Sequence, residues 1–96
     1  MLAEFSVVPI GAGEHLSPYV AECVKIVKDS GLKYELVATG TIVEGDYDQV
    51  MQTVGQCHKK VRSMTNRVIT SVRIDDWGKT GDEMERKVKS VEEKVR

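Results

Sequence analysis

A short hairpin constrains the fold of this chain more than any other feature of its sequence. Two sets of side chains alternate along residues 34–39 and again along residues 41–44, and Gly40 separates the two segments. Alternation with a period of two is typical of strands whose faces meet different surroundings. Glu44 falls within the second segment, on the face that carries mixed side chains. A carboxylate at such a position needs a partner, so the hairpin predicts a polar site as well as a fold element.

The residues before the hairpin predict a strand and then a helix. Apolar and polar positions alternate from Leu2 to Ile10, as they do in a half-buried strand. Ser17 and Pro18 favour a helix start, because a serine oxygen accepts hydrogen bonds from free N–H groups and proline fits the first helical position. We expect this helix to run to about Ser30 and to end at Gly31.

A second helix and a further strand are expected after the hairpin. Asp46 can cap the helix, with Gln49 three residues on in a capping-box arrangement. Its inner face is formed by apolar residues that recur every three or four positions: Tyr47, Val50, Met51, Val54, Cys57 and Val61. Residues 63–66 interrupt this period, and alternation from Arg67 to Asp75 predicts a strand.

A third helix is expected at the end of the chain. Thr80 and Glu83 form another capping box, which predicts the start of this helix. Its apolar stripe consists of Met84, Val88, Val91 and Val95. Because two helices already complete a two-layer core, this stripe is available for a contact between subunits.

The order of these elements predicts a single domain over residues 1–96. Strand, helix, strand, strand, helix, strand is the order of the ferredoxin-like βαββαβ sandwich, an α+β fold with two helices on one face of a four-stranded antiparallel sheet. The third helix is then an additional C-terminal helix. Right-handed crossovers place the first and third strands in the middle of the sheet. On the uncovered face, Glu44 is expected beside Ser6.

Composition and charge exclude several classes of protein. The chain has 14 Lys and Arg against 15 Asp and Glu, so it lacks the excess positive charge that nucleic-acid binding uses. No apolar run approaches the roughly 20 residues that span a bilayer, and the start of the chain lacks the pattern of a secretory signal. We therefore expect a cytoplasmic protein without nucleic-acid or membrane partners. Cys23 and Cys57 fall at apolar helix positions and are expected to be reduced core thiols.

The uncovered sheet face is expected to be an interface. Val8, Val37, Ile42 and Ile69 form an apolar patch there, and a contiguous exposed patch of this kind usually marks a contact, although antiparallel sheets also leave solvated faces. Burial by a second subunit would make the charges on this face costly unless they are paired. Arg73 could neutralise one carboxylate. The surplus acidic groups then call for donors or a cation from a ligand.

Several short segments together carry a resemblance to a known family. They are the run from Gly40 to Gly45, the preceding Tyr34-Glu35, the later Arg67-Val68 and Ile74-Asp75-Asp76, and the opening Ala3-Glu4-Phe5-Ser6 with Pro9. With them the chain resembles, over nearly its whole length, the thiamine-binding-protein family of small ferredoxin-like proteins. The resemblance implies a cytoplasmic homo-oligomer, a dimer or a dimer-of-dimers tetramer, that binds thiamine or its hydroxymethylpyrimidine moiety without chemistry. It implies neither a cofactor nor a metal.

The expected ligand-binding residues combine polar groups with an apolar floor. An aminopyrimidine offers N–H donors and a thiazolium ring carries positive charge, so carboxylates and hydroxyls are suitable partners. The candidates are Glu44, Thr41, Thr39, Ser6, Val37 and Ile69. Strict alternation places Thr41 on the helix side of the sheet, opposite Glu44, unless a bend or bulge at Gly40 re-aims it.

Two other functions are compatible with parts of the sequence. In the first, the chain is a structural or regulatory homo-oligomeric module without a small-molecule ligand, and the uncovered face only joins subunits. The second is an enzyme, which is disfavoured because His15 and His58 have no acid or nucleophile at informative spacing. Trp77 is open to two roles, stacking on a ligand ring or covering the sheet end and the third helix.

Overall fold

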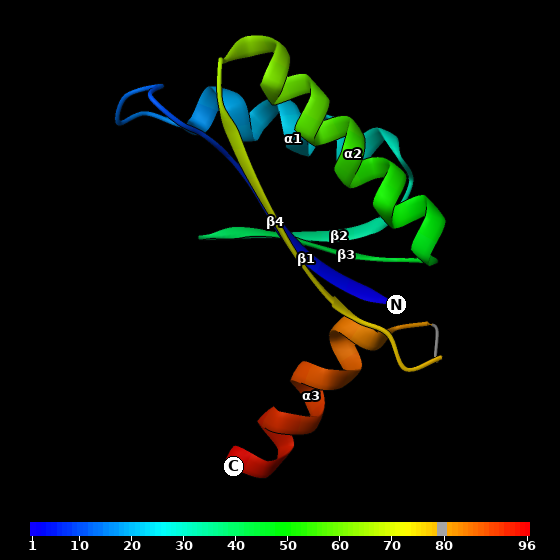
Figure 1. Ribbon diagram of the computed structural model, residues 1–96. Coiled ribbons are helices and arrows are strands. Elements are labelled where there is room, and N and C mark those ends of the chain that lie inside the picture. Colours follow the sequence, from blue (N-terminus) through cyan, green and yellow to red (C-terminus); the bar gives the residue numbers. More distant parts are fainter. Residues whose placement is uncertain (79–80) are drawn as a thin grey trace.

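The elements of the structure follow the predicted order (Figure 1). The computed structural model describes residues 1–78 and 81–96. Its elements are β1 (Leu2–Pro9), α1 (Ser17–Asp29), β2 (Lys33–Val37), β3 (Gly40–Glu44), α2 (Tyr47–Met64), β4 (Val68–Asp75) and α3 (Glu83–Val95). The predicted α+β, ferredoxin-like fold with an additional C-terminal helix is confirmed.

The sheet has four antiparallel strands in the order β2-β3-β1-β4, so β1 and β3 are central as predicted. Side chains alternate between its two faces. One face meets α1 and α2 and encloses the core, whose fully buried members include Val27, Val43, Val50, Cys57 and Val61. The other face of β1 carries Glu4, Ser6 and Val8, which are partly or largely exposed.

The helix ends follow local signals at most positions. Asp46 caps α2 as predicted, because its carboxylate accepts a hydrogen bond from the backbone N–H of Gln49 at 2.9 Å. The prediction that Ser17 caps α1 is wrong: Ser17 is already helical, and Leu16 holds the N-cap position without a side-chain bond. α1 ends before Gly31 as predicted, and the φ of 78° at Gly31 is one that glycine adopts without strain. Over the described residues, no helix is long and apolar enough to cross a bilayer.

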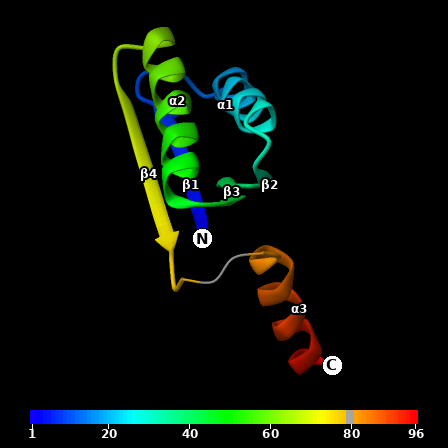
Figure 2. The same cartoon turned by 90° about the vertical axis from the view of Figure 1, so that its right-hand side faces the viewer.

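The last helix, α3, stands apart from the two-layer sandwich. α1 and α2 lie together on one face of the sheet, whereas α3 extends away from the end of the sheet where β4 finishes (Figures 1 and 2). Met84, the first member of its predicted apolar stripe, is buried. Val88, Val91 and Val95 are each more than half exposed. The contact between α3 and the sheet therefore involves its first turn.

Candidate functional site

An opening beside β1 forms because its two neighbouring strands pair with it over different lengths. β4 pairs with the whole of β1, from Leu2 to Pro9. The register of β3 with β1 runs from Leu2↔Glu44 only as far as Phe5↔Thr41. Beyond Phe5 the tip of the β2–β3 hairpin diverges from β1 (Figure 1). The second half of β1 is thus left facing a gap that reaches through the sheet toward α1.

A cavity of about 370 Å³ occupies this gap. Its walls are formed by β1, the start of α1 and the hairpin tip: Phe5, Ser6, Val7, Val8, Leu16, Val20, Cys23, Leu36, Val37, Ala38, Thr39, Gly40 and Thr41. The volume lies within the roughly 300–1,000 Å³ of small-molecule sites, and an apolar lining with a few polar groups is typical of them. The hydroxyls of Ser6, Thr39 and Thr41 are the polar groups that the side chains supply.

The cavity brings Thr41 and Ser6 together although they belong to opposite faces of the sheet. Thr41 is buried on the helix side, opposite Phe5, as alternation predicts. Ser6 lies on the other face. Because the cavity passes through the gap between the strands, its lining includes side chains from both faces. No reversal of the alternation at Gly40 is needed for Thr41 to reach the site.

Gly40 allows the close approach of β3 to β1 at the edge of the cavity. A Cβ atom at this position would lie 2.8 Å from the backbone oxygen of Phe5, closer than real Cβ contacts allow. That oxygen belongs to a paired central strand and has little room to move. The close approach of the two strands at this point therefore requires a residue without a side chain.

Replacing Gly40 with alanine is expected to lower the free energy of unfolding by about 1–3 kcal/mol, because β3 must shift away from β1. Urea unfolding followed by circular dichroism measures the effect. Gly55→Ala is the matched control, since a Cβ at this α2 position meets nothing within 4 Å, and we expect it to stabilise the protein by up to about 1 kcal/mol. Equal stability of the two variants would contradict the role given to Gly40.

A carboxylate lies next to the cavity, and it is Glu4. A shallower depression of about 240 Å³ on the uncovered face shares Phe5, Ser6 and Thr39 with the cavity, and is also lined by Glu4 and Arg73. Arg73 Nη2 lies 3.7 Å from Glu4 Oε2, so the expected neutralisation of one carboxylate is present. Because Arg73 is exposed, this ion pair is weak and a cationic ligand could compete with it. The sequence pattern that could have identified Glu4 is its two-residue spacing from Ser6, since residues i and i+2 of a strand share a face.

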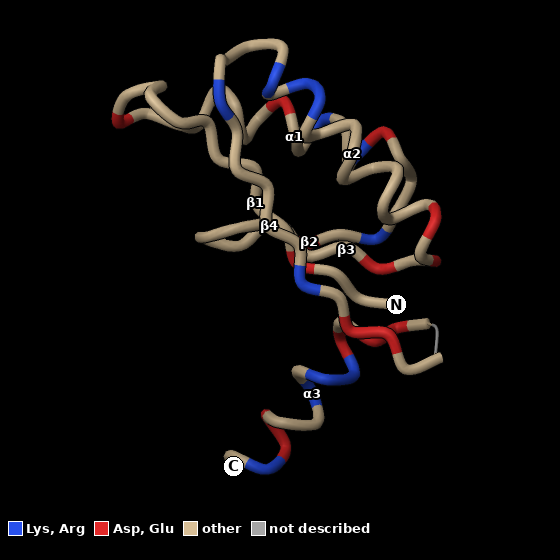
Figure 3. The backbone as a smooth tube through the Cα atoms, in the orientation of Figure 1, with Lys and Arg blue, Asp and Glu red and all other residues tan. Residues whose placement is uncertain are grey.

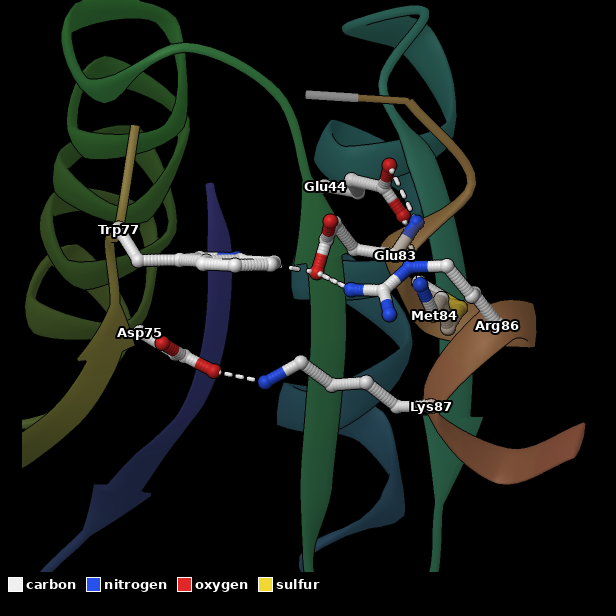
Figure 4. A network of polar contacts seen from close by, with 7 residues as sticks. All are labelled: Glu44, Asp75, Trp77, Glu83, Met84, Arg86 and Lys87. Carbon is white, nitrogen blue, oxygen red and sulfur yellow. Dashed lines mark hydrogen bonds and ion pairs between the residues drawn. The ribbon is translucent and has the colours of Figure 1, made fainter. Parts of the chain in front are cut away.

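The prediction that Glu44 lies beside Ser6 is wrong. The antiparallel register pairs Glu44 with Leu2, at the opposite end of β1 from the cavity. Glu44 is 8% exposed, and its carboxylate accepts hydrogen bonds from the backbone N–H groups of Glu83 and Met84, each at 3.0 Å (Figure 4). Those groups form the first turn of α3, where free N–H groups and the helix dipole favour an anion. Glu44 thus caps a helix from outside it.

A network of polar contacts surrounds this cap. The Glu83 carboxylate accepts hydrogen bonds from Trp77 Nε1 at 3.2 Å and from Arg86 Nη2 at 2.8 Å, and the Arg86 guanidinium stands 5.4 Å from the centre of the Trp77 ring (Figure 4). Trp77 therefore lies against α3 and does not line the cavity. Thr80, the predicted capping residue, lies outside the described residues. The other member of that predicted capping box, Glu83, has its carboxylate engaged by these two side chains.

Acidic residues gather at the junction between the sheet and α3 (Figure 3). Lysines of the sheet and of α3 form ion pairs with these acidic residues. Lys87 of α3 pairs with Asp75 at the end of β4. Lys33 of β2 pairs with Glu85 and Asp82, which raise the pKa of Lys33. These exposed pairs add little stability, whereas the Glu44 carboxylate is a buried polar contact between the sheet and the first turn of α3.

The structure divides the six predicted binding residues into two groups. Ser6, Val37, Thr39 and Thr41 line the cavity, whereas Glu44 and Ile69 do not. Ile69 lies opposite Val8 on the uncovered face, and the two side chains are 49% and 36% exposed. They belong to the apolar patch that the sequence predicts there.

Comparisons with known proteins agree with this fold. The family model described as thiamine-binding protein matches residues 3–92. A UPF0045 protein of Methanocaldococcus jannaschii is 34% identical over 93 residues, and the match covers 97% of this chain and 93% of the relative. A UPF0045 protein of Synechocystis is 38% identical over 93 residues, and the match covers 96% of this chain and 77% of the relative. The crystal structure of the M. jannaschii protein superposes with a TM-score of 0.89 at 35% identity over 96% of this chain and 95% of that one. A Thermotoga maritima protein proposed to act in thiamine biosynthesis or salvage has the same fold, with a TM-score of 0.80 at 21% identity over 93% and 96% of the two chains. The chain therefore belongs to the thiamine-binding protein family.

Proposed function

We propose that this chain binds a small cationic or aminopyrimidine ligand, such as thiamine or its hydroxymethylpyrimidine moiety, in the cavity beside β1 and does so without a chemical step. The observation that carries the proposal is the composition of the site: an apolar cavity of about 370 Å³ with hydroxyls inside it and a carboxylate at its edge. The family to which the chain belongs, and the role proposed for the T. maritima protein, support the same ligand class.

The apolar walls suit a planar heterocyclic ring. Val7, Val20 and Leu36 come from β1, α1 and β2 and enclose the cavity from different sides. A ring placed among them gains by the removal of apolar surface from water. The hydroxyls of Ser6 and Thr41 accept or donate hydrogen bonds as required, which matches the mixed donors and acceptors of an aminopyrimidine. Ring burial supplies affinity in this arrangement, and the hydroxyls orient the ring.

The charge of the site comes from Glu4 in the proposed complex. Glu4 lines the depression, which shares Phe5, Ser6 and Thr39 with the cavity. A thiazolium or other cation placed there would replace the weak contact with Arg73. Glu44, whose oxygens are occupied by α3, is given no part in binding.

We further propose that a second copy of the chain covers the uncovered sheet face. Val8 and Ile69 lie side by side there, and adjacent exposed apolar side chains of this kind can mark a contact surface. A homodimer or dimer-of-dimers tetramer built on this face would also cover the depression that contains Glu4. A structural module without a ligand would assemble through the same face, so assembly alone does not distinguish the two functions.

Calorimetric titration with thiamine and with hydroxymethylpyrimidine tests the binding proposal. We expect saturable binding that Glu4→Gln weakens about tenfold for the cationic ligand, since a hydrogen bond to a charged group contributes about 1.5–3 kcal/mol. Glu35→Gln is the matched control, because Glu35 is an exposed carboxylate of β2 that lines neither the cavity nor the depression. Mass spectrometry of the recovered ligand should show it unchanged.

Absence of heat and of thermal stabilisation with both ligands at millimolar concentration would contradict the binding proposal and favour the structural module. Chemical change of the recovered ligand would contradict only the statement that binding occurs without chemistry. Ser6→Ala and Thr41→Val then locate the site. Equal affinity in both of these variants would remove the cavity as the place of binding.

A further inference from the structure

Two cysteines meet where α1 packs against α2, 34 residues apart in the sequence. Cys23 Sγ lies 3.9 Å from the carbonyl oxygen of Cys57, and Cys57 Sγ lies 3.5 Å from the carbonyl oxygen of Cys23. These reciprocal contacts place each thiol against the backbone of the other residue. Both thiols are free, and Cys23 and Cys57 are 5% and 0% exposed.

The cavity gives one of the two thiols a path to small molecules. Cys23 lines the cavity, and Cys57 does not. A reagent that enters the cavity therefore meets Cys23 first, with Cys57 next to it. This is the spatial order in which an attacked cysteine and a resolving cysteine act.

The pKa values of the two neighbouring thiols shift in opposite directions. The Cys57 thiol lowers the pKa of Cys23, against the opposing effects of burial and of Glu22. The neighbouring Cys23 side chain, together with burial, raises the pKa of Cys57. The thiolate, which is the reactive form, is thus favoured on the residue that lines the cavity.

We propose that Cys23 and Cys57 form a redox-active pair that hydrogen peroxide entering the cavity oxidises to a disulfide between α1 and α2. The Cys23 thiolate attacks one peroxide oxygen, the O–O bond breaks, and the leaving hydroxide takes up a proton as water. Cys57 sulfur then attacks the Cys23 sulfenic acid, an S–S bond forms, the S–O bond breaks, and a second water leaves with the Cys57 proton. Two thiols lose two electrons, and the peroxide is reduced to two waters. This site does not depend on the ligand proposed above.

Treatment of the folded, reduced protein with hydrogen peroxide tests the proposal. We expect the intact mass to fall by two hydrogens, peptide mapping to join the segments that contain Cys23 and Cys57, and dithiothreitol to reverse both changes. With a small alkylating reagent in place of peroxide, we expect Cys23 to react about tenfold faster than Cys57, as exposure and thiolate character dictate. That measurement uses the unaltered chain.

Two variants separate the roles of the thiols. Cys57→Ser should form a sulfenic acid at Cys23 that dimedone traps, because the resolving thiol is gone. Cys23→Ser, the matched control, should leave Cys57 unmodified over the same time. If either variant fails to fold, the relative alkylation rates in the unaltered chain decide the order of attack. Disulfides only between chains, two unchanged thiols, or faster reaction at Cys57 would overturn the proposal.

Discussion

Replacing Glu44 with alanine is expected to detach α3 from the sheet. The substitution removes the acceptor for two buried backbone N–H groups, those of Glu83 and Met84. Asp82, the N-cap residue, makes no side-chain capping bond to the backbone of α3, because its carboxylate pairs with Lys33 instead. Hydrogen bonds to a charged group contribute about 1.5–3 kcal/mol each, so the loss of both should weaken the docking of α3 by about 3–6 kcal/mol. Limited trypsin digestion measures the result, because the exposed Arg86 and Lys87 become cleavable when α3 leaves.

Two further variants make this test specific. Glu44→Gln keeps one carbonyl acceptor and should lose roughly half of the effect. Glu35→Ala removes an exposed carboxylate of β2 and should change stability by less than about 0.5 kcal/mol. Because Glu44 does not line the cavity, ligand affinity in Glu44→Gln should stay close to that of the unaltered protein. Unchanged protease resistance in Glu44→Ala would show that α3 is held by other contacts.

Replacing Ile69 with aspartate is expected to convert the proposed oligomer into monomers. Ile69 is 49% exposed in the single chain and lies opposite Val8 on the uncovered face, near the start of the edge strand β4. In an assembly built on this face, the new carboxylate would be buried without a partner, which costs several kcal/mol. The dissociation constant should rise by about a thousandfold or more, since each 1.4 kcal/mol corresponds to a factor of ten. Sedimentation velocity of both proteins at matched concentration measures the change.

Val88→Asp is the control for this prediction, because Val88 is an exposed valine of α3 and not of the sheet. If Val88→Asp dissociates while Ile69→Asp remains assembled, the interface is formed by the apolar stripe of α3 and not by the uncovered sheet face. A monomeric unaltered protein would remove the assembly proposal altogether. Ligand titration of monomeric Ile69→Asp then tells whether the cavity of one chain suffices for binding.

The fold was predictable because its signals are local. Alternation identified the strands and their faces, and Asp46 with Gln49 marked the start of α2, as the hydrogen bond between them confirms. The central place of β1 and β3 followed from the handedness of the crossovers, which holds for nearly all such connections. Each of these signals lies within a few residues or rests on a general rule.

The site was only partly predictable because it depends on register. The sequence indicates that Glu4 and Glu44 share the uncovered face, but it does not give the register, that is, which residue of β1 lies opposite Glu44. Pairing Leu2 with Glu44 places Glu44 far from Ser6 and leaves Glu4 as the nearby carboxylate. The partner of Glu44 is a pair of backbone groups 39 and 40 residues later, for which no side-chain pattern exists. The gap that admits Thr41 arises in the same way from the early end of one strand pairing.

The pairing of β1 along its whole length with β4 also sets the order in which the protein folds during synthesis. Leu2 pairs with Asp75 and Pro9 with Val68, so this ladder joins segments that leave the ribosome far apart in time. β1 and β3 can pair once residue 44 has emerged, but one edge of β1 then stays open until the last strand is made. Such long-range pairing slows folding, and an open central strand is prone to aggregate. Early contact between nascent chains is therefore a specific hazard of this topology. A chaperone that shields β1 would shorten the time during which its open edge can pair with another chain.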